Sequence, residues 1–149
     1  MKIRDAKAED TPRLDALLSK LIRDEAHYDG NINRRCEVKD NYCGRIGLDG
    51  HKLLLIEDNE EAVGYLYGFI YHIPGIYKAP IAIIDALFIE ESHRRKGYAS
   101  ALISEFRKFA GENGVRQIEL KVMSDNKPAL SLYEKLSFSE TKKYMKMEL

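Results

Sequence analysis

Three consecutive cations, Arg94, Arg95 and Lys96, precede Gly97 and closely follow an apolar run that ends at Ile89. Apolar residues then recur at helical spacing, so the order is strand, polar turn and helix start. The first turn of a helix has unpaired backbone N–H groups and a partial positive charge, which both favour a bound phosphate. A glycine lets the backbone approach such a group closely. The stretch therefore predicts a site for a phosphate-bearing ligand, although a solvated basic turn could have the same sequence.

Other motifs with a known chemistry are absent from the chain. It contains no GxxxxGK[ST] loop, no GxGxxG after a strand and no HExxH. The four histidines are scattered, and the spacing of Cys36 and Cys43 fits neither a CxxC redox pair nor a zinc site. We therefore expect no metal site, and two free thiols in a reducing compartment.

The composition limits the remaining classes of protein. A chain of 149 residues, 44% hydrophobic and 32% charged, suits one globular domain, which we expect to span residues 1–149. A net charge of zero disfavours a general nucleic-acid binder. No apolar run approaches the ~20 residues of a membrane span, and the first residues lack the apolar region of a signal peptide. We therefore expect a cytoplasmic protein with neither a nucleic-acid nor a membrane partner.

The elements that must position the basic turn follow from the apolar periodicity. Thr11 is the expected N-cap of the first helix, with Pro12 in its first turn. Each expected helix has one apolar stripe, so helices should cover both faces of a mixed sheet. The expected order is a strand at Ile3, a helix from Thr11, a short helix near 34–43, strands over 52–57, 63–71 and 80–89, a helix after Gly97, a strand over 118–122, a helix near Pro128 and a strand over 144–149.

Two stretches of the sequence resemble motifs of one family. The run Leu87-Phe88-Ile89-x4-Arg94-Arg95-Lys96-Gly97-Tyr98-Ala99 is similar to the acetyl-CoA signature [R/Q]xxGx[G/A] of the GNAT superfamily of N-acetyltransferases. The stretch from Asn126 to Phe138 resembles the NxxAxxxYxxxGF segment of that family and departs from it at Ser137, where glycine is usual. The order of elements matches as well. The resemblance implies a mixed α/β (α+β) GNAT fold, with a central twisted sheet of about six to seven strands flanked by about four helices.

The resemblance also implies a site for acetyl-CoA. In this family two neighbouring strands separate at a bulge, and the pantetheine arm pairs with the strand backbone in the gap. Leu87 and Ile89 would supply that pairing, the basic turn would hold the pyrophosphate, and Asn126 would contact the cofactor. The residues expected to bind it are Leu87, Phe88, Ile89, Arg94, Arg95, Lys96, Gly97, Tyr98, Ala99, Ser100 and Asn126.

The implied reaction is direct attack of a primary amine on the thioester in a ternary complex. An alkylammonium group has a pKa near ~10.4, so it must first lose a proton. Asp85 matches the acidic residue of polyamine-type members, and the strand period puts it on the face of Leu87 and Ile89. The base is Asp85, Glu90 or a water relay, and a purely structural Asp85 is the alternative. Tyr133 matches the family's usual general acid, but it also falls on the apolar stripe of its helix.

The acceptor is the part of the reaction that the sequence determines least. The aromatic face of Tyr65, Tyr67, Phe69 and Tyr71 could line an acceptor slot. Asp24, Glu25 and Asp29 could attract a cationic amine. A similarity to diamine acetyltransferases favours a small, polyamine-like amine, while peptide amines, lysine side chains and aminoglycosides stay open. The family resemblance also makes a homodimer an expectation.

Two other classes of function compete with the enzyme. The first is a catalytically silent domain that binds CoA as a sensor, and the presence of both Tyr133 and Asp85 argues against it. The second is a nucleic-acid or partner-binding domain that uses Arg94, Arg95 and Lys96, and the absence of any companion basic stripe argues against that.

Overall fold

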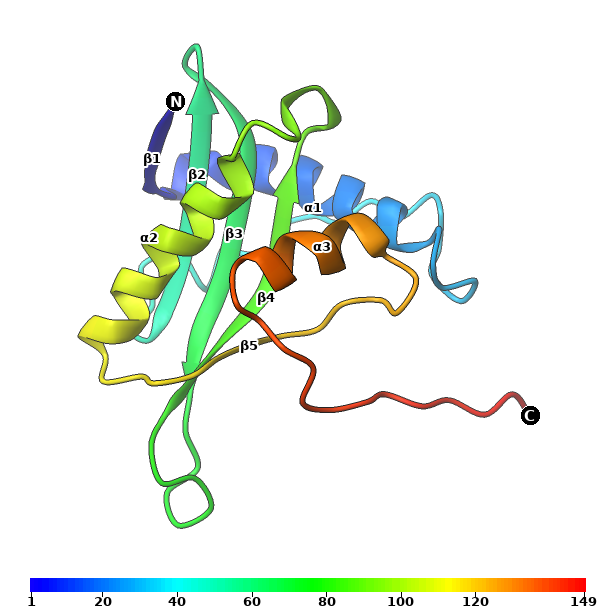
Figure 1. Cartoon of the computed structure of the whole chain (residues 1–149). Coiled ribbons are helices and arrows are strands. Elements are labelled where there is room, and N and C mark those ends of the chain that lie inside the picture. Colours follow the sequence, from blue (N-terminus) through cyan, green and yellow to red (C-terminus); the bar gives the residue numbers. More distant parts are fainter.

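The computed structural model describes residues 1–149 and contains one five-stranded sheet in the order β1-β2-β3-β4-β5. The helix α1 covers one face of the sheet, and α2 and α3 lie on the other (Figure 1). None of the helices combines the length and hydropathy needed to cross a membrane. The elements are β1 (Lys2–Asp5), η1 (Ala8–Asp10), α1 (Thr11–Glu25), β2 (His51–Asp58), β3 (Glu61–Tyr71), β4 (Ile81–Ile89), η2 (Glu91–His93), α2 (Tyr98–Glu112), β5 (Ile118–Leu120) and α3 (Lys127–Lys135).

The sheet separates two hydrophobic clusters. The first lies under α1, where Leu14 and Leu17 are fully buried against β3 residues such as Tyr65. The second lies under α2, whose Phe106 is also fully buried. Gly68 makes this contact possible, because a Cβ atom at that position would overlap the Phe106 ring. The predicted amphipathic helices therefore bury their stripes on opposite faces, as expected.

The start of α1 differs from the prediction by one residue. Thr11 is the first helical residue, and Asp10 occupies the N-cap position. The Asp10 carboxylate accepts hydrogen bonds from the Lys7 backbone N–H at 2.7 Å and from the Arg4 guanidinium at 2.8 Å. These bonds connect β1 to α1 and fix where the helix begins.

A bulge in β4 changes which way its side chains point. Tyr67 of β3 lies opposite Ala86 and Gly68 lies opposite Ile84, so Asp85 has no partner on β3. An extra residue on one strand interrupts the alternation of side chains between the two faces. Ile84 accordingly packs in the α2 cluster, whereas Ala86 packs in the α1 cluster.

The expected helix near 34–43 is absent, and the segment forms turns instead. The Asp15 carboxylate on α1 accepts hydrogen bonds from the backbone N–H groups of Asp40 and Asn41, at 2.8 and 3.2 Å. Asp40 is held at a positive φ of 53°, which a helix does not allow. Tyr42 is thereby inserted into the α1 cluster with 1% of its surface exposed. Bonds to α1 therefore replace the bonds that a local helix would have made.

The expected strand over 144–149 is also absent. Residues 139–149 leave the body of the protein as extended chain (Figure 1), and none of their backbone groups makes a hydrogen bond to other backbone. The sheet ends at β5, because no further segment of the chain pairs with it. The expectation of six to seven strands and four helices is therefore wrong, and the fold has five strands and three α-helices.

Candidate active site

The strands β4 and β5 pair over a short distance and then separate. Their parallel ladder ends at the pair Ile84 and Leu120, where β5 itself ends. The strand β4 continues to Ile89, so its edge from Asp85 onward has no strand partner on that side. An extended molecule can add to such an edge through main-chain hydrogen bonds. We call this opening the fork, and the bulged Asp85 lies at its start.

The turn between β4 and α2 presents a row of unpaired backbone donors. Arg95 and Gly97 have positive φ values of 64° and 81°, and the helix α2 begins directly after them at Tyr98. The backbone N–H groups of residues 95–100 donate no hydrogen bond to another backbone group. Successive N–H groups in such a turn form a concavity that suits anions, and the α2 dipole adds to it. The turn therefore fits the pyrophosphate of a CoA-type ligand.

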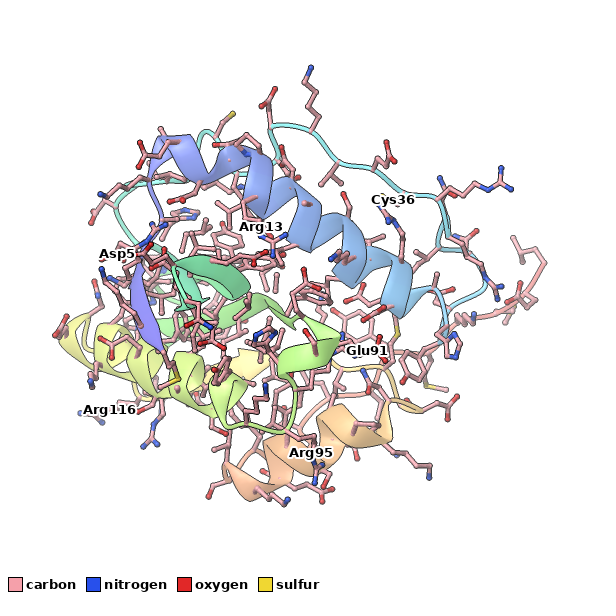
Figure 2. The ribbon with its side chains drawn as sticks, turned by 90° about the horizontal axis from the view of Figure 1, so that it is seen from above. Asp5, Arg13, Cys36, Glu91, Arg95 and Arg116 are labelled. Carbon is pink, nitrogen blue, oxygen red and sulfur yellow. The ribbon has the colours of Figure 1, made fainter.

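Arg94 differs from its two neighbours because its donors are used within the protein. Its Nε donates to the Ile89 carbonyl at 2.9 Å, and its Nη2 donates to Asp24 at 2.8 Å. The guanidinium also lies 5.4 Å from the centroid of the Phe88 ring. Arg94 thus connects the end of β4 to α1. Figure 2 shows Arg95 on the side of the molecule away from α1, where it is exposed to a ligand.

The other residues expected to bind the cofactor differ in how far their side chains are exposed. The Phe88 side chain is 5% exposed and belongs to the α1 cluster, so only its backbone is available to a ligand. Ile89 is similarly buried, and Leu87 is half-buried in the α2 cluster. Asn126 caps α3, since its Oδ1 accepts a hydrogen bond from the Ala129 N–H at 3.3 Å. Tyr98, Ala99 and Ser100 are half-buried in the first turn of α2.

Tyr133 is positioned by the C-terminal cap of α3. The Phe138 N–H donates to the Tyr133 carbonyl at 2.9 Å, and the Ser137 N–H donates to the Glu134 carbonyl at 3.0 Å. This pair of bonds is a Schellman motif, which requires a left-handed residue after the helix. Ser137 takes that conformation with a φ of 70°, so the serine keeps the geometry of the usual glycine. The Phe138 ring then packs edge-on against Tyr133, with centroids 5.7 Å apart.

Glu25, Asp85 and Tyr133 come from three elements, and the charge of Asp85 acts on Glu25 while that of Glu25 acts on Tyr133. Burial raises the pKa of Glu25, and the charges of Asp85 and Asp24 raise it further. Burial raises the pKa of Tyr133 to about 12, with Glu25 as the second cause. The fork therefore brings together a carboxylate with increased proton affinity and a hydroxyl that stays protonated at neutral pH.

Asp85 does not share a face with Leu87 and Ile89, and that expectation is wrong. Leu87 and Ile89 pack in the α2 cluster. The charge of Asp85 instead raises the pKa values of Tyr65 and Tyr67 of the α1 cluster, after the larger effect of their burial. The strand period fails here because the bulge lies at Asp85 itself. The Asp85 side chain is exposed, so it is available to a ligand in the fork.

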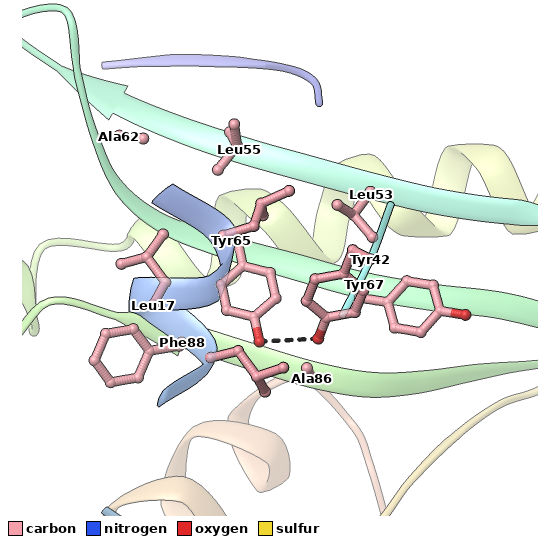
Figure 3. Packing of buried hydrophobic residues seen from close by; sticks show 11 residues of the cluster. Leu17, Tyr42, Leu53, Leu55, Ala62, Tyr65, Tyr67, Ala86 and Phe88 are labelled. Atoms are coloured by element: carbon pink, nitrogen blue, oxygen red, sulfur yellow. Dashed lines mark hydrogen bonds between the residues drawn. The ribbon is translucent and has the colours of Figure 1, made fainter. Parts of the chain in front are cut away.

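Tyr65 and Tyr67 of the aromatic face belong to the core rather than to a slot for an acceptor, whereas Phe69 is half-buried and Tyr71 is exposed. Tyr65 is fully buried and Tyr67 is 3% exposed. Figure 3 shows the hydroxyl of Tyr65 bonded to that of Tyr42, at 3.0 Å, with Ala86 beside them. Burial of both rings raises the pKa values of their hydroxyls. The two hydroxyls therefore stay uncharged within the α1 cluster.

Glu90 is poorly suited to act as the base. Its carboxylate is paired with Lys20 at 2.7 Å and with Arg13 at 3.2 Å. Burial alone would raise the pKa of Glu90, but the hydrogen bonds and charges of Lys20 and Arg13 lower it overall. A carboxylate with a lowered pKa is a weak proton acceptor. The sequence named Glu25 only as part of an acidic group that could attract a cationic amine, because its electrostatic link to Asp85 depends on the packing of α1.

Comparison with known proteins identifies the family. Residues 17–138 match the family described as Acetyltransferase (GNAT) family. The uncharacterized N-acetyltransferase MJ1207 of Methanocaldococcus jannaschii is 32% identical over 92 residues, which are 62% of this chain and 41% of that protein. The uncharacterized N-acetyltransferase YhfO of Bacillus subtilis is 31% identical over 97 residues, 62% of this chain and 63% of the relative. The matched regions thus span less than two thirds of these relatives.

Solved structures share the fold along the whole chain. A mutant of the BH1408 protein from Bacillus halodurans superposes with a TM-score of 0.89 at 19% identity, covering 100% of this chain and 99% of that one. The aminoglycoside N-acetyltransferase AAC(6')-Iy in complex with CoA has a TM-score of 0.75 at 17% identity, with coverage of 99% and 98%. The structural likeness agrees with the family match, and the chain therefore belongs to the GNAT family of acetyltransferases.

Proposed function

We propose that this protein is an acetyl-CoA-dependent N-acetyltransferase that transfers the acetyl group to a primary amine. Family membership supports the reaction class, and the row of free N–H groups at residues 95–100 supports a CoA ligand. The observation that carries the proposal is that Asp85 lies at the start of the fork, while Glu25 and Tyr133 lie on the helices that cover the two faces of the sheet, within electrostatic range. A domain that only sensed CoA would need the N–H row but not this set of proton-transfer groups.

The carboxylates would receive the amine. Most of an alkylamine is protonated at neutral pH, so it approaches as a cation and must give up one proton before attack. Asp85 is exposed at the fork and Glu25 is half-buried beside it, and both attract the cation. Because burial and the Asp85 charge raise the pKa of Glu25, Glu25 holds a proton more readily than an isolated glutamate. We assign proton acceptance to Glu25, with the neighbouring Asp85 carboxylate attracting the cationic amine.

Tyr133 would act at the other end of the reaction. The bound acetyl-CoA supplies the thioester, and direct attack by the amine in a ternary complex leaves a thiolate that needs a proton. The Tyr133 hydroxyl, with its pKa raised to about 12, is protonated at every pH at which the protein would work. No hydrogen bond is among the causes that raise its pKa, so its proton can be directed at the sulfur. The cap at Ser137 and the Phe138 ring hold it in place.

The acceptor we propose is a small amine with more than one positive charge, such as a diamine or polyamine. Two carboxylates within mutual electrostatic range favour a dication over a neutral amine. An aminoglycoside is the second candidate, because the aminoglycoside N(6')-acetyltransferase type 1 of Acinetobacter baumannii is 23% identical over 94 residues. A peptide amine with a single charge would use only part of this site.

An assay of thiol release from acetyl-CoA over a panel of amines tests the proposal. The panel contains a diamine, a polyamine, an aminoglycoside and a peptide with a free N-terminus. We expect release with the multiply charged amines and an acetylated product detected by mass spectrometry. Binding of CoA without release in the presence of any amine would favour the sensor domain instead.

A further inference from the structure

Asp58 is the last residue of β2, at the end of the sheet where the turn to β3 begins. Along this strand Leu54 and Ile56 belong to the α2 cluster, and the period of a strand puts Asp58 on the same side. Asn59 and Glu60 follow it at positive φ values of 50° and 65°, which are typical of a tight hairpin turn. The strand and the turn together fix where this carboxylate lies.

The Asp58 carboxylate interacts with residues on both sides of the turn that precedes α2. Its Oδ2 lies 3.2 Å from Nε2 of His93 in η2, and both side chains are half-buried. On the other side of the turn, partial burial raises the pKa of the Tyr98 hydroxyl, and the charge of Asp58 raises it further. The rings of His93 and Tyr98 have centroids 6.0 Å apart. One carboxylate of β2 thus links the residue before the turn to the first residue of α2.

The His93 ring has a polar partner at each of its nitrogens. The Ser92 hydroxyl lies at hydrogen-bond distance, 2.9 Å, from Nδ1, and Asp58 faces Nε2. A neutral imidazole has one donor and one acceptor nitrogen, so Ser92 can serve either form of the ring. Rotation of the ring would give up both partners. The contact with Asp58 therefore fixes the position of the His93 side chain as well as its direction.

The next residue, Arg94, holds the same backbone from the other face of the sheet. Its Nη2 donates to Asp24 of α1 at 2.8 Å. Arg95 follows with a positive φ of 64°, which costs a residue with a Cβ atom about 1 kcal/mol or more. Such a conformation persists only where the surrounding structure imposes it. The contacts of His93, Arg94 and Tyr98 surround Arg95 in the chain, so they are the ones that can impose it.

We infer that Asp58 is a positioning residue for the turn that binds the pyrophosphate of acetyl-CoA. It holds the chain at His93 and at Tyr98, and it thereby keeps the free N–H groups of residues 95–100 in an arrangement that suits a diphosphate. The inference rests on the proposed function, because it needs CoA as the ligand. A carboxylate repels a phosphate at short range, so Asp58 acts through the backbone of the turn and not by binding the ligand.

The affinity for CoA of Asp58→Asn, measured by calorimetry, tests the inference. Asparagine keeps the shape of the side chain and removes the charge that faces His93, so we expect the dissociation constant to rise about fivefold. The matched control is Glu57→Gln, the neighbouring position of β2, where Glu57 pairs with Arg4 at 2.6 Å. This control also loses an ion pair of β2 but does not touch the turn, and its dissociation constant should stay within about twofold of wild type.

The partner variant His93→Gln tests whether the two side chains act as one connection. It should weaken CoA binding by a similar factor, and the double variant with Asp58→Asn should lose less than the product of the two single effects. Losses that multiply fully would show that Asp58 and His93 act separately, and would overturn the connection through His93.

A truncated substrate separates positioning from a general loss of structure. S-acetylpantetheine carries the same thioester as acetyl-CoA but has no pyrophosphate. In Asp58→Asn the KM for acetyl-CoA should rise about fivefold, while kcat and the KM for S-acetylpantetheine stay within about twofold of wild type. A deficit of the same size with both substrates would overturn the inference. So would an unchanged CoA affinity in Asp58→Asn, or an equal loss in Glu57→Gln.

The calorimetric measurement needs no acceptor amine, so the inference and the proposed function can fail separately. Normal CoA binding by Asp58→Asn, together with acetyl transfer by the wild type, would overturn only the inference. A wild type that binds CoA but acetylates no amine would contradict the proposed reaction, and the calorimetric comparison would still decide the role of Asp58. A wild type that binds no CoA would overturn both.

Discussion

Burial raises the pKa of the Tyr133 hydroxyl on α3, and the charge of Glu25, on the last turn of α1, raises it further. The two helices lie on opposite faces of the sheet (Figure 1), so this influence acts across the layer of strands. The fork between β4 and β5 is where that layer opens, and the bulged Asp85 lies at its start. An amine that enters beside Glu25 and a thioester beside Tyr133 can therefore meet through the fork.

Replacing Ser137 by glycine should stabilise the protein. The φ of 70° at Ser137 costs a residue with a Cβ atom about 1 kcal/mol or more, and glycine adopts it freely. We expect the melting temperature to rise by about 2–4 °C for Ser137→Gly. Ser139→Gly is the matched control, because Ser139 lies beyond the cap and lacks the positive φ. A gain of the same size in both variants would contradict the role of the Schellman motif.

Glu25→Gln should stabilise the protein in a manner that depends on pH. Because the pKa of Glu25 is raised in the folded state, the folded protein binds this proton more tightly than the unfolded chain. Wild-type stability is therefore lost as the pH rises from the ordinary glutamate pKa through the raised one. Glutamine does not titrate, so its advantage should be absent at low pH and should grow as the pH rises through the raised pKa of Glu25.

Thermal melts at about pH 4 and about pH 7 measure this difference. Glu112→Gln, an exposed position on α2, is the control and should change the melting temperature little at either pH. A Glu25→Gln variant that gains stability equally at both pH values would show that burial of the charge is not the cause.

Asp85→Asn should lower the pKa of Glu25. Two carboxylates, Asp85 and Asp24, raise that pKa by their charges, and Asp85 has the larger effect. Removal of the Asp85 charge therefore makes deprotonation of Glu25 easier. Titration of the Glu25 carboxyl carbon by NMR, in wild type and variant, measures the shift directly. Asp29→Asn serves as the control, since Asp29 is not among the groups that act on Glu25. An unchanged pKa of Glu25 in Asp85→Asn would show that the Asp85 charge does not act on Glu25, and would contradict this prediction.

Gly97→Ala should weaken binding of acetyl-CoA. The φ of 81° at Gly97 is disfavoured for alanine by about 1–2 kcal/mol, so the variant either strains or reshapes the N–H row. We expect the dissociation constant to rise by about tenfold. Gly111→Ala, within α2 and with open space at its Cβ position, is the matched glycine control. Calorimetric titration with CoA compares the two variants, and equal affinities would argue against a pyrophosphate site at this turn.

The sequence predicted the elements whose apolar period was unbroken. The helix stripe from Leu14 and the motif around Tyr133 are local patterns, and they give α1 and α3 nearly at their observed bounds. The side on which Asp85 lies was not predictable in this way, since a bulge depends on how β3 pairs with β4. The sequence did not predict Glu25 as a candidate proton acceptor for a similar reason, because its surroundings come from segments distant in the chain.

Two further errors have physical causes of the same kind. Turns replace the helix expected near 34–43, because the Asp15 carboxylate on α1 binds the backbone of that segment. The strand expected over 144–149 has the right alternation, but a strand also needs a partner, and no strand of the sheet pairs with this segment. Sequence periodicity reports the preference of a segment, whereas its neighbours decide the outcome.

We propose that the fork is the reaction centre, where Tyr133 would deliver a proton to the leaving sulfur. The Tyr133→Phe variant is the decisive test of this proposal. Turnover of Tyr133→Phe is measured with saturating acetyl-CoA and the best amine of the panel, together with CoA affinity by calorimetry. The ring and its packing on Phe138 are retained in this variant, and only the hydroxyl is lost. We predict that turnover falls by about 100-fold or more while CoA affinity stays within about twofold of wild type. Unchanged turnover at saturating amine would contradict the assignment of Tyr133 as the general acid.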